Sequence, residues 1–130
     1  MSELTIRDAT ADDVVDVLRL VDAALLAIDH DAVVTAIDRE DALVAVDDGT
    51  VVGALVLEPR QQGAHVEAIA VHRDRRGQGI GRQLVDAAAE RNSRLTADFR
   101  PEVEPFWCSL GFRVERRDDR LWGERSTNTS

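Results

Sequence analysis

The sequence predicts a single α/β (α+β) domain, in which a mixed, mostly antiparallel central sheet of about six to seven strands is flanked by about four helices. Short apolar strand patterns alternate with helical patterns along the chain. An Asp-Gly turn signal joins two of the strands into a hairpin, and a glycine-rich segment lies between a strand and a helix. At 130 residues, the chain has room for one core rather than for two ordinary domains.

The first part of the chain predicts a strand and two helices. Residues 4–7 alternate in the manner of a strand. Thr10 and Asp13 have the spacing of a capping box, which favours a helix start directly after them. Apolar residues then recur on one helical face: Val14, Val17, Leu18, Val21 and Leu25. A weaker helical pattern covers residues 31–37, and we expect the first helix to pack on a sheet.

The remaining elements are predicted in this order: strands over 42–46, 51–57 and 65–71, a helix over 80–91, a strand over 95–99, a short helix over 101–110, and a closing hairpin over 112–115 and 121–122. Gly111 follows the second of these helices in a natural C′ position. The polar end of the chain has nothing to bury. We therefore expect one folded domain over residues 1–123 and a disordered tail over residues 124–130.

The charge of the chain argues against a phosphate-backbone partner. The 16 basic and 25 acidic residues give a net charge of −9, which repels nucleic acid and anionic membrane surfaces. Every basic residue is arginine, and aspartate outnumbers glutamate. This surface indicates a halophilic protein, because a salty cytoplasm screens the repulsion between carboxylates. A GC-rich genome also explains arginine in place of lysine, although not the excess of aspartate.

The cellular compartment is predicted from cysteine usage and from hydropathy. Cys108 is the only cysteine, so no intrachain disulfide can form and a reducing interior is favoured. The first ten residues have neither the basic region nor the apolar run of a signal peptide, and no segment approaches membrane-spanning length. We expect a cytoplasmic protein, without a metal site.

The most informative segment is the glycine-rich run over residues 72–84. Its arginines and glycines follow an apolar strand: Arg73, Arg75, Arg76 and Arg82 surround Gly77, Gly79 and Gly81. Glycine lets backbone N–H groups approach an anion closely, and a helix start adds unpaired N–H groups and a positive dipole end. Guanidinium groups add fixed positive charge. This layout predicts a site for a phosphorylated cofactor.

Two common nucleotide-binding motifs do not fit this segment. A P-loop requires Lys followed by Ser or Thr after the glycines, and the chain contains no lysine. A dinucleotide-binding fold requires the spacing G-x-G-x-x-G after a first strand. Here the glycines alternate as G-x-G-x-G, and three predicted strands lie between them and the first two helices.

The remaining pattern, R-x-x-G-x-G, is formed by Arg76, Gly79 and Gly81 after the strand VEAIAV, and it resembles motif A of the GNAT N-acetyltransferase superfamily. The segment FWCSLGF, residues 106–112, resembles the F-Y-x-x-x-G-F segment of that superfamily. The preceding hairpin matches its second and third strands. The resemblance covers the chain to about Gly123 and implies an acyl-CoA N-acyltransferase-like fold.

The resemblance implies a binding site for acetyl-CoA (coenzyme A). The backbone N–H groups of one loop would wrap the pyrophosphate, and its residues are Arg76, Gly77, Gln78, Gly79, Ile80, Gly81 and Arg82. The exposed backbone of the fourth strand would pair with the pantetheine arm at Ile69, Ala70 and Val71. For the side chains of Arg73, Arg75 and Arg82, contact with the pyrophosphate or the 3′-phosphate and solvated surface charge both remain open.

The resemblance also implies direct attack of an amine on the acetyl thioester, which needs a base. Glu67 lies on the strand leading into the cofactor site and is the candidate catalytic residue; the alternative is an outward-facing position on a half-exposed strand. His65 should share its face, and an edge position in water is the favoured interpretation for it. Trp107 replaces the usual general-acid tyrosine, and an indole supplies no proton at neutral pH. We expect Cys108 to be a small buried filler.

We therefore expect an acetyl-CoA-dependent N-acetyltransferase that transfers acetyl to a primary amine, of a small molecule or a protein, by direct attack in a ternary complex. The alternative is a non-catalytic acyl-CoA-binding or sensing module of the same fold, which Trp107 favours. A third hypothesis, compatible with both, is a homodimer formed through the strand edges of the C-terminal hairpin. The acidic residues Asp29, Asp31 and Asp38 suit a cationic amine, and a solvated halophilic surface explains them equally.

Overall fold

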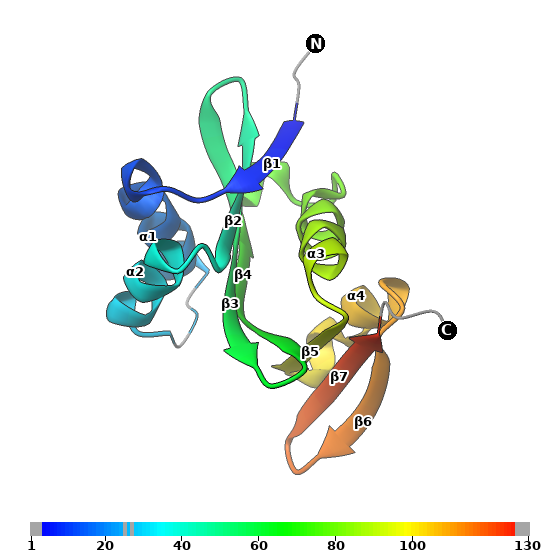
Figure 1. The fold of residues 1–130 in the computed structure, drawn as a ribbon. Helices are drawn as coiled ribbons and strands as arrows, with labels where there is room; N and C mark the ends of the chain where they lie inside the picture. The colour runs from blue at the N-terminus through cyan, green and yellow to red at the C-terminus, as the bar shows by residue number, and fades with distance from the viewer. Residues whose placement is uncertain (1–3, 25, 27, 127–130) are drawn as a thin grey trace.

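The computed structural model describes residues 4–24, 26 and 28–126. Its strands and helices follow one another in this order: β1 (Leu4–Asp8), α1 (Val14–Ala23), α2 (His30–Asp38), β2 (Ala42–Asp47), β3 (Thr50–Arg60), β4 (Gly63–Val71), α3 (Ile80–Arg91), β5 (Arg94–Phe99), α4 (Glu104–Ser109), β6 (Arg113–Arg117) and β7 (Arg120–Ser126). Figure 1 shows α1 and α2 on one side of the sheet and α3 and α4 on the other. No described helix is long and apolar enough to cross a lipid bilayer.

The strands form one seven-stranded sheet in the order β1-β2-β3-β4-β5-β7-β6. Every neighbouring pair is antiparallel except β4 and β5, which are parallel. The mixed, mostly antiparallel sheet with four α-helices confirms the predicted fold class.

The parallel pair β4 and β5 holds together over a short stretch only. Among the described residues, Ala64 pairs with Leu95 and His65 pairs with Thr96, and no later residue of β4 pairs with β5. Since β4 continues to Val71, its edge is bare beyond this point. The two halves of the sheet therefore part in the middle of the molecule and leave backbone N–H and C=O groups without strand partners.

Two apolar layers cover the two faces of the sheet. The face under α1 and α2 buries Val17 and Val33 of the helices against Val44 and Val56 of the strands. The opposite face packs α3 and α4 against residues such as Leu55 and carries the larger aromatic side chains. Each fully buried Val or Leu contributes about 1.5–3 kcal/mol relative to leaving it exposed, so the layers fix the strands that border the opening.

A β-bulge in β4 sets the direction of its polar side chains. Val56 pairs with Ala68 and Leu57 pairs with Val66, so Glu67 is an extra residue without a partner on β3. A bulge bends its strand and redirects side chains. As a result, Glu67 reaches the cavity beside α2, on the same side of the sheet as Ala68.

The structure confirms the predicted elements and corrects two boundaries. Strand β7 runs to Ser126, so residues 124–126 belong to the sheet and not to a tail. Ion pairs of Glu124 with Arg94 and of Arg125 with Asp86 hold this end of the strand. The helix predicted over 101–110 is divided into a 3₁₀ turn (Pro101–Val103) and α4. Residues 127–130 and the predicted apolar position Leu25 lie outside the described residues.

Candidate active site

The glycine loop presents backbone donors at the start of α3. Gly77 and Gly79 have φ angles of +79° and +80°, a left-handed conformation that favours glycine. Gly79 is the N-cap of α3, and among the described residues no side chain caps this end of the helix. At Gly81 an added Cβ would lie 3.1 Å from the ring of Phe106. The first N–H groups of α3 are therefore free to bind an anion, as helix N-termini do.

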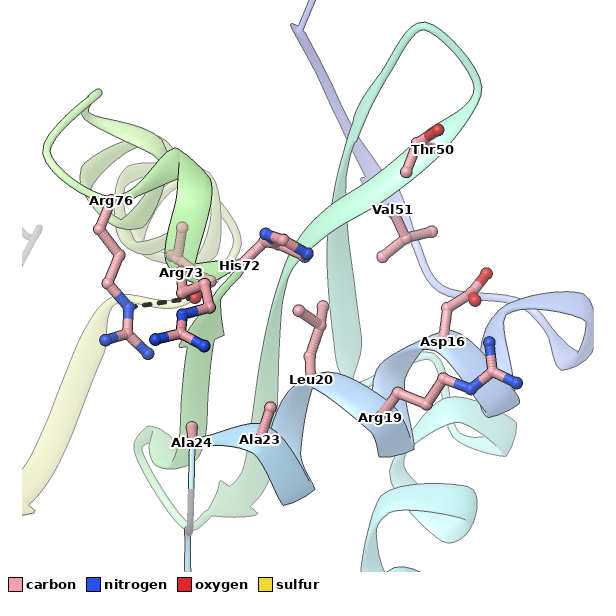
Figure 2. Close-up of a pocket in the computed structure, with 11 residues that line it drawn as sticks. Asp16, Arg19, Leu20, Ala23, Ala24, Thr50, Val51, His72, Arg73 and Arg76 are labelled. Carbon is pink, nitrogen blue, oxygen red and sulfur yellow. Dashed lines mark hydrogen bonds between the residues drawn. The ribbon is translucent and has the colours of Figure 1, made fainter.

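Side chains of the same loop attach it to the rest of the fold. Arg75 forms an ion pair with the buried carboxylate of Asp47, at the end of β2. Arg82 donates through Nη2 to the carbonyl oxygen of Ser109 at 2.8 Å. Arg76 donates through Nε to the carbonyl oxygen of Val71 at 3.3 Å, the dashed line in Figure 2. These contacts hold the loop in place at the end of β4.

The bare edge of β4 leads directly into this loop. Ile69, Ala70 and Val71 lie beyond the last residue of β4 that pairs with β5. The structure thus brings together the residues that the sequence predicts for the pantetheine arm and for the pyrophosphate: a strand edge and, at its end, a set of backbone N–H groups.

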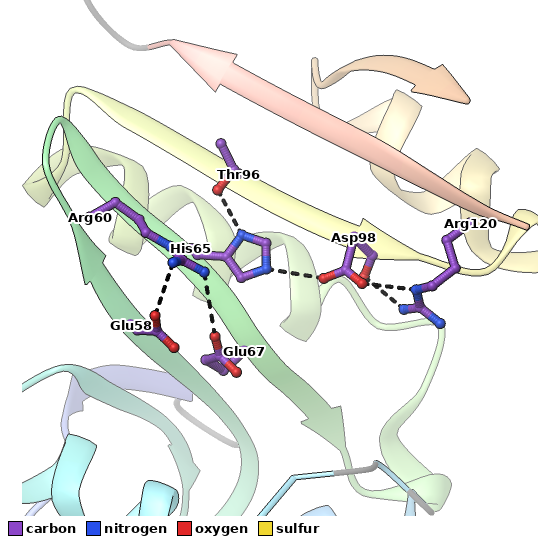
Figure 3. Close-up of polar contacts among 7 residues, drawn as sticks. All are labelled: Glu58, Arg60, His65, Glu67, Thr96, Asp98 and Arg120. Atoms are coloured by element: carbon purple, nitrogen blue, oxygen red, sulfur yellow. Dashed lines mark hydrogen bonds and ion pairs between the residues drawn. The ribbon is translucent and has the colours of Figure 1, made fainter. Parts of the chain in front are cut away.

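Glu67 lies on this strand, near Glu58 of β3, and Figure 3 shows Arg60 between the two acids. The Glu67 side chain is 31% exposed, and Glu67 is the exposed residue of β4, so the outward-facing position on a half-exposed strand remains compatible with the structure. Arg60 approaches both acids, with Nη1 3.0 Å from Glu58 Oε1 and Nη2 4.0 Å from Glu67 Oε1. Glu58 and Glu67 lie close enough for their carboxyl groups to interact, and they can share a hydrogen bond when one of them carries a proton.

This environment shifts the pKa values of Glu67 and Glu58 in opposite directions. Burial, the hydrogen bond with Glu58 and the charge of Glu58 together raise the pKa of Glu67 to about 7. The pKa of Glu58 is lowered, chiefly because the hydrogen bond from Glu67 stabilises its ionised form. Glu67 therefore gains or loses its proton close to neutral pH, as a general base should.

Glu67 and Glu58 open into a cavity of about 470 Å³ beneath α2. Its other polar lining comes from Asp31, Thr35 and Arg39. This volume lies in the range of small-molecule sites. The cavity leaves Glu58 and Glu67 accessible to a small molecule from outside the chain.

His65 forms a second polar network, which the sequence interpretation of an edge position in water does not anticipate. The residue is only 5% exposed. Nε2 lies 3.0 Å from Asp98 Oδ1, and Nδ1 lies 2.7 Å from Thr96 Oγ1 (Figure 3). Because a carboxylate oxygen only accepts, Nε2 carries the hydrogen, and in a neutral ring Nδ1 accepts from the Thr96 hydroxyl. The interpretation is wrong because β5 covers this end of β4.

The His65 network continues across β5 to β7. Arg120 donates through Nε to Asp98 Oδ2 at 2.8 Å. Burial acts to raise the pKa of Asp98, but the hydrogen bonds from His65 and Arg120 outweigh it and the pKa is lowered. Trp122 stacks on His65 with ring centroids 5.2 Å apart, and Arg117 lies 4.4 Å above the same indole. The network joins the two halves of the sheet at the point where they part.

Two sequence signals could have indicated these partners. Thr96 and Asp98 occupy alternate positions of a strand whose other face is apolar, which places them on one face. Glu58 lies directly opposite His65 in the β3–β4 hairpin, so counting from the turn places it beside Glu67. Neither signal identifies the partners until the pairing of the strands is known.

Trp107 and Cys108 lie away from these polar groups. Trp107 is 4% exposed and packs in the core against Phe99 and Phe112, with ring centroids 5.3 and 4.9 Å apart. Cys108 is exposed, so the expectation of a buried filler is wrong. A residue next to a buried one on a helix points about 100° away from it, which explains the difference.

Comparisons with known proteins agree with this architecture. A sequence profile described as "Acetyltransferase (GNAT) domain" matches residues 38–114. Ard1 from Thermoplasma volcanium is 20% identical, with a TM-score of 0.84 over 97% of this chain and 99% of that chain. The ribosomal-protein-S18-alanine N-acetyltransferase from Escherichia coli is 17% identical, with a TM-score of 0.83 over 98% of this chain and 96% of that chain.

A third structure extends beyond this chain. N-acetylglutamate synthase from Neisseria gonorrhoeae, complexed with coenzyme A and N-acetyl-glutamate, is 16% identical with a TM-score of 0.80. The match covers 98% of this chain and 36% of that chain. A search of curated protein sequences finds no match. The profile spans more than half of the chain and includes the hairpin, the parting strands and the glycine loop, and the chain therefore belongs to the GNAT acetyltransferase family.

Proposed function

We propose that the protein is an acetyl-CoA-dependent N-acetyltransferase that transfers acetyl to a primary amine by direct attack in a ternary complex. The observation that carries the proposal is one strand: β4 bears Glu67 in its middle, a bare edge beyond it and the glycine loop at its end. A donor substrate bound along this edge would place its reactive end close to Glu67. Proximity of this kind supplies much of the rate of a two-substrate reaction.

The loop fits the diphosphate of coenzyme A. Gly77 and Gly79 offer backbone without side-chain obstruction, and nothing lies within 4 Å of a Cβ built at either residue. Ile80, Gly81 and Arg82 supply the first N–H groups of α3. Acetyl-CoA, when bound, supplies the acetyl thioester. The chain's own contribution is to bind the diphosphate at this loop and the pantetheine arm along Ile69, Ala70 and Val71.

Glu67 is proposed as the base. Its carboxylate accepts a proton from the ammonium group of the acceptor, so that the amine lone pair can attack the acetyl carbon while the bond to sulfur breaks. A pKa of about 7 keeps a large fraction of Glu67 ionised at neutral pH and still lets it bind the proton firmly. Trp107 is assigned no role in proton transfer, because its side chain lies in the core. The second proton lost by the amine nitrogen is proposed to pass to solvent, and solvent is proposed to protonate the thiolate.

Calorimetry of acetyl-CoA binding in molar KCl tests the cofactor site. The variant Gly79→Glu adds a negative charge where the diphosphate would lie and should abolish the micromolar binding expected of the wild type. Gly111→Glu is a matched control, because its φ of +84° and its open surroundings are like those of Gly79. Absence of binding by folded wild-type protein would overturn the proposal.

A screen of primary amines then separates two outcomes. Acetyl transfer to any amine supports the enzyme. Tight binding of acetyl-CoA without turnover of any amine would instead support a non-catalytic acyl-CoA-binding module, the alternative that the buried Trp107 at the tyrosine position favours.

A further inference from the structure

A second cavity, of about 600 Å³, lies between α1 and the turn that follows β4 (Figure 2). Arg19 of α1 lines it on one side, and His72, Arg73 and Arg76 line it on the other. Apolar side chains, including Leu20, complete the wall. The cavity is separate from the one beside Glu67, which is lined by α2 and the β3–β4 hairpin.

The charge in this cavity is unusual for the chain. Three arginines and one acid, Asp16, line it, although the protein carries a net charge of −9. Most arginines are engaged within the fold, as Arg75 is with Asp47. Within the described part of the chain, neither Arg19 nor Arg73 has a hydrogen-bond or ion-pair partner. Arg19 and Arg73 are exposed and line one cavity without a partner among the described residues, so their guanidinium groups are available to an anion from outside the chain.

The cavity adjoins the proposed diphosphate loop. Arg73 and Arg76 belong to the turn between β4 and α3, and Arg76 is also the first residue of the loop. An anion bound here therefore lies next to the diphosphate and can belong to the same ligand. Coenzyme A carries, besides its diphosphate, a separate phosphate monoester on the ribose 3′-oxygen.

We propose that this cavity binds the 3′-phosphate of coenzyme A, with Arg19 and Arg73 as its principal donors. The inference rests on the proposed function, because it assumes that the diphosphate binds at the glycine loop. Arginine is suited to the task, since its planar fork can donate two parallel hydrogen bonds to a phosphate. Because Arg19 lies on α1, the first helix would also contact the cofactor.

The inference predicts discrimination between coenzyme A and 3′-dephospho-coenzyme A. Loss of one charge-assisted hydrogen bond lowers affinity by about tenfold to a hundredfold. The wild type should therefore bind coenzyme A at least about tenfold more tightly than the dephosphorylated form. The negative net charge of the protein disfavours binding of the more highly charged ligand, coenzyme A, so a preference for it requires local cations.

The experiment is calorimetric titration of both ligands at one fixed ionic strength, with the wild type, Arg73→Gln, Arg19→Gln and the control Arg116→Gln. Arg116 is an exposed arginine on β6, outside both cavities. The first two variants should lose affinity for coenzyme A and keep their affinity for 3′-dephospho-coenzyme A, while the control keeps both. Thermal melts confirm that each variant is folded.

The outcomes separate this inference from the proposed function. Equal affinity of the wild type for the two ligands would overturn the inference and leave the cofactor site intact. A preference for coenzyme A that survives in both Arg73→Gln and Arg19→Gln would overturn it too, because other residues would then hold the phosphate. Failure of the folded wild type to bind either ligand would overturn the proposed function and this inference with it.

Discussion

Glu67 and Asp98 are carboxylic acids on adjacent strands of one sheet, and their pKa values are shifted in opposite directions. Exposure does not distinguish them, since both side chains are partly exposed. Their neighbours do. Asp98 accepts hydrogen bonds from His65 and Arg120, whereas Glu67 faces a second carboxyl group, Glu58. The hydrogen bonds to Asp98 therefore favour its ionised form, whereas burial and the neighbouring Glu58 raise the pKa of Glu67 to about 7.

Replacing Glu67 should have the largest effect. Glu67→Gln removes the proposed base and should lower kcat/KM about 10²- to 10⁴-fold, with acetyl-CoA binding unchanged in calorimetry. Glu90→Gln, on the exposed side of α3, is the control. An unchanged kcat/KM would mean that another group takes the proton, and the contrast between the two acids would lose its functional meaning.

Replacing Asp98 should affect stability instead. Asp98→Asn leaves His65 and Arg120 without an ionised acceptor and should lower the free energy of unfolding by about 1–2 kcal/mol, at the low end for such bonds because of the exposure of the pair. Urea denaturation at pH 7 measures this. Asp119→Asn, exposed in the β6–β7 turn, should leave stability unchanged; an equal loss in both variants would contradict a stabilising role of Asp98.

The stabilisation by Asp98 also has a defined pH dependence. The pKa of Asp98 is lower in the folded than in the unfolded state, so its stabilisation is complete above the ordinary aspartate pKa of about 3.9. The stabilisation is lost as the pH falls through the lower folded-state value. Between pH 5 and acid pH, the wild type should therefore lose more stability than Asp98→Asn, on the same urea assay.

Removing the carboxyl group of Glu58 should bring the pKa of Glu67 closer to that of Asp98. Glu58→Gln takes away a negative charge and lets an amide donate to Glu67, so the pKa of Glu67 should fall by about one unit. The acid limb of the kcat/KM profile should shift to lower pH, which raises activity at pH 6 relative to pH 8. An unshifted limb would show that burial alone sets the pKa of Glu67.

The smallest expected effect concerns the stack above the His65 network. Arg117→Gln removes the guanidinium that lies over Trp122 and should lower the free energy of unfolding by about 0.5–1 kcal/mol. A thermal melt beside Arg116→Gln, also on β6, accounts for the general loss of charge, and Glu115→Gln accounts for the ion pair that Arg117 makes with Glu115. Identical melting temperatures for the two arginine variants would mean that the contact of Arg117 with Trp122 does not stabilise the fold.

Local patterns predicted the strands, the glycine loop and the position of Glu67, because periodicity and turn residues are encoded within short windows of sequence. The partners of Glu67 and His65 could not be predicted in the same way. Glu58 meets Glu67 through a hairpin register with a bulge, and Asp98 meets His65 through a parallel pairing between distant segments. The burial of His65 and the extension of β7 to Ser126 likewise depend on strands that come together only in the fold.

The bare edge of β4 has an evolutionary consequence. A ligand that completes a sheet is recognised by main-chain N–H and C=O groups, which every residue except proline provides. Ile69 and Ala70 can therefore be exchanged for other strand-forming residues without removing the groups that a ligand would contact. Selection on such a site acts on the path of the backbone more than on the identity of its side chains, so the opening can persist while the sequence around it drifts.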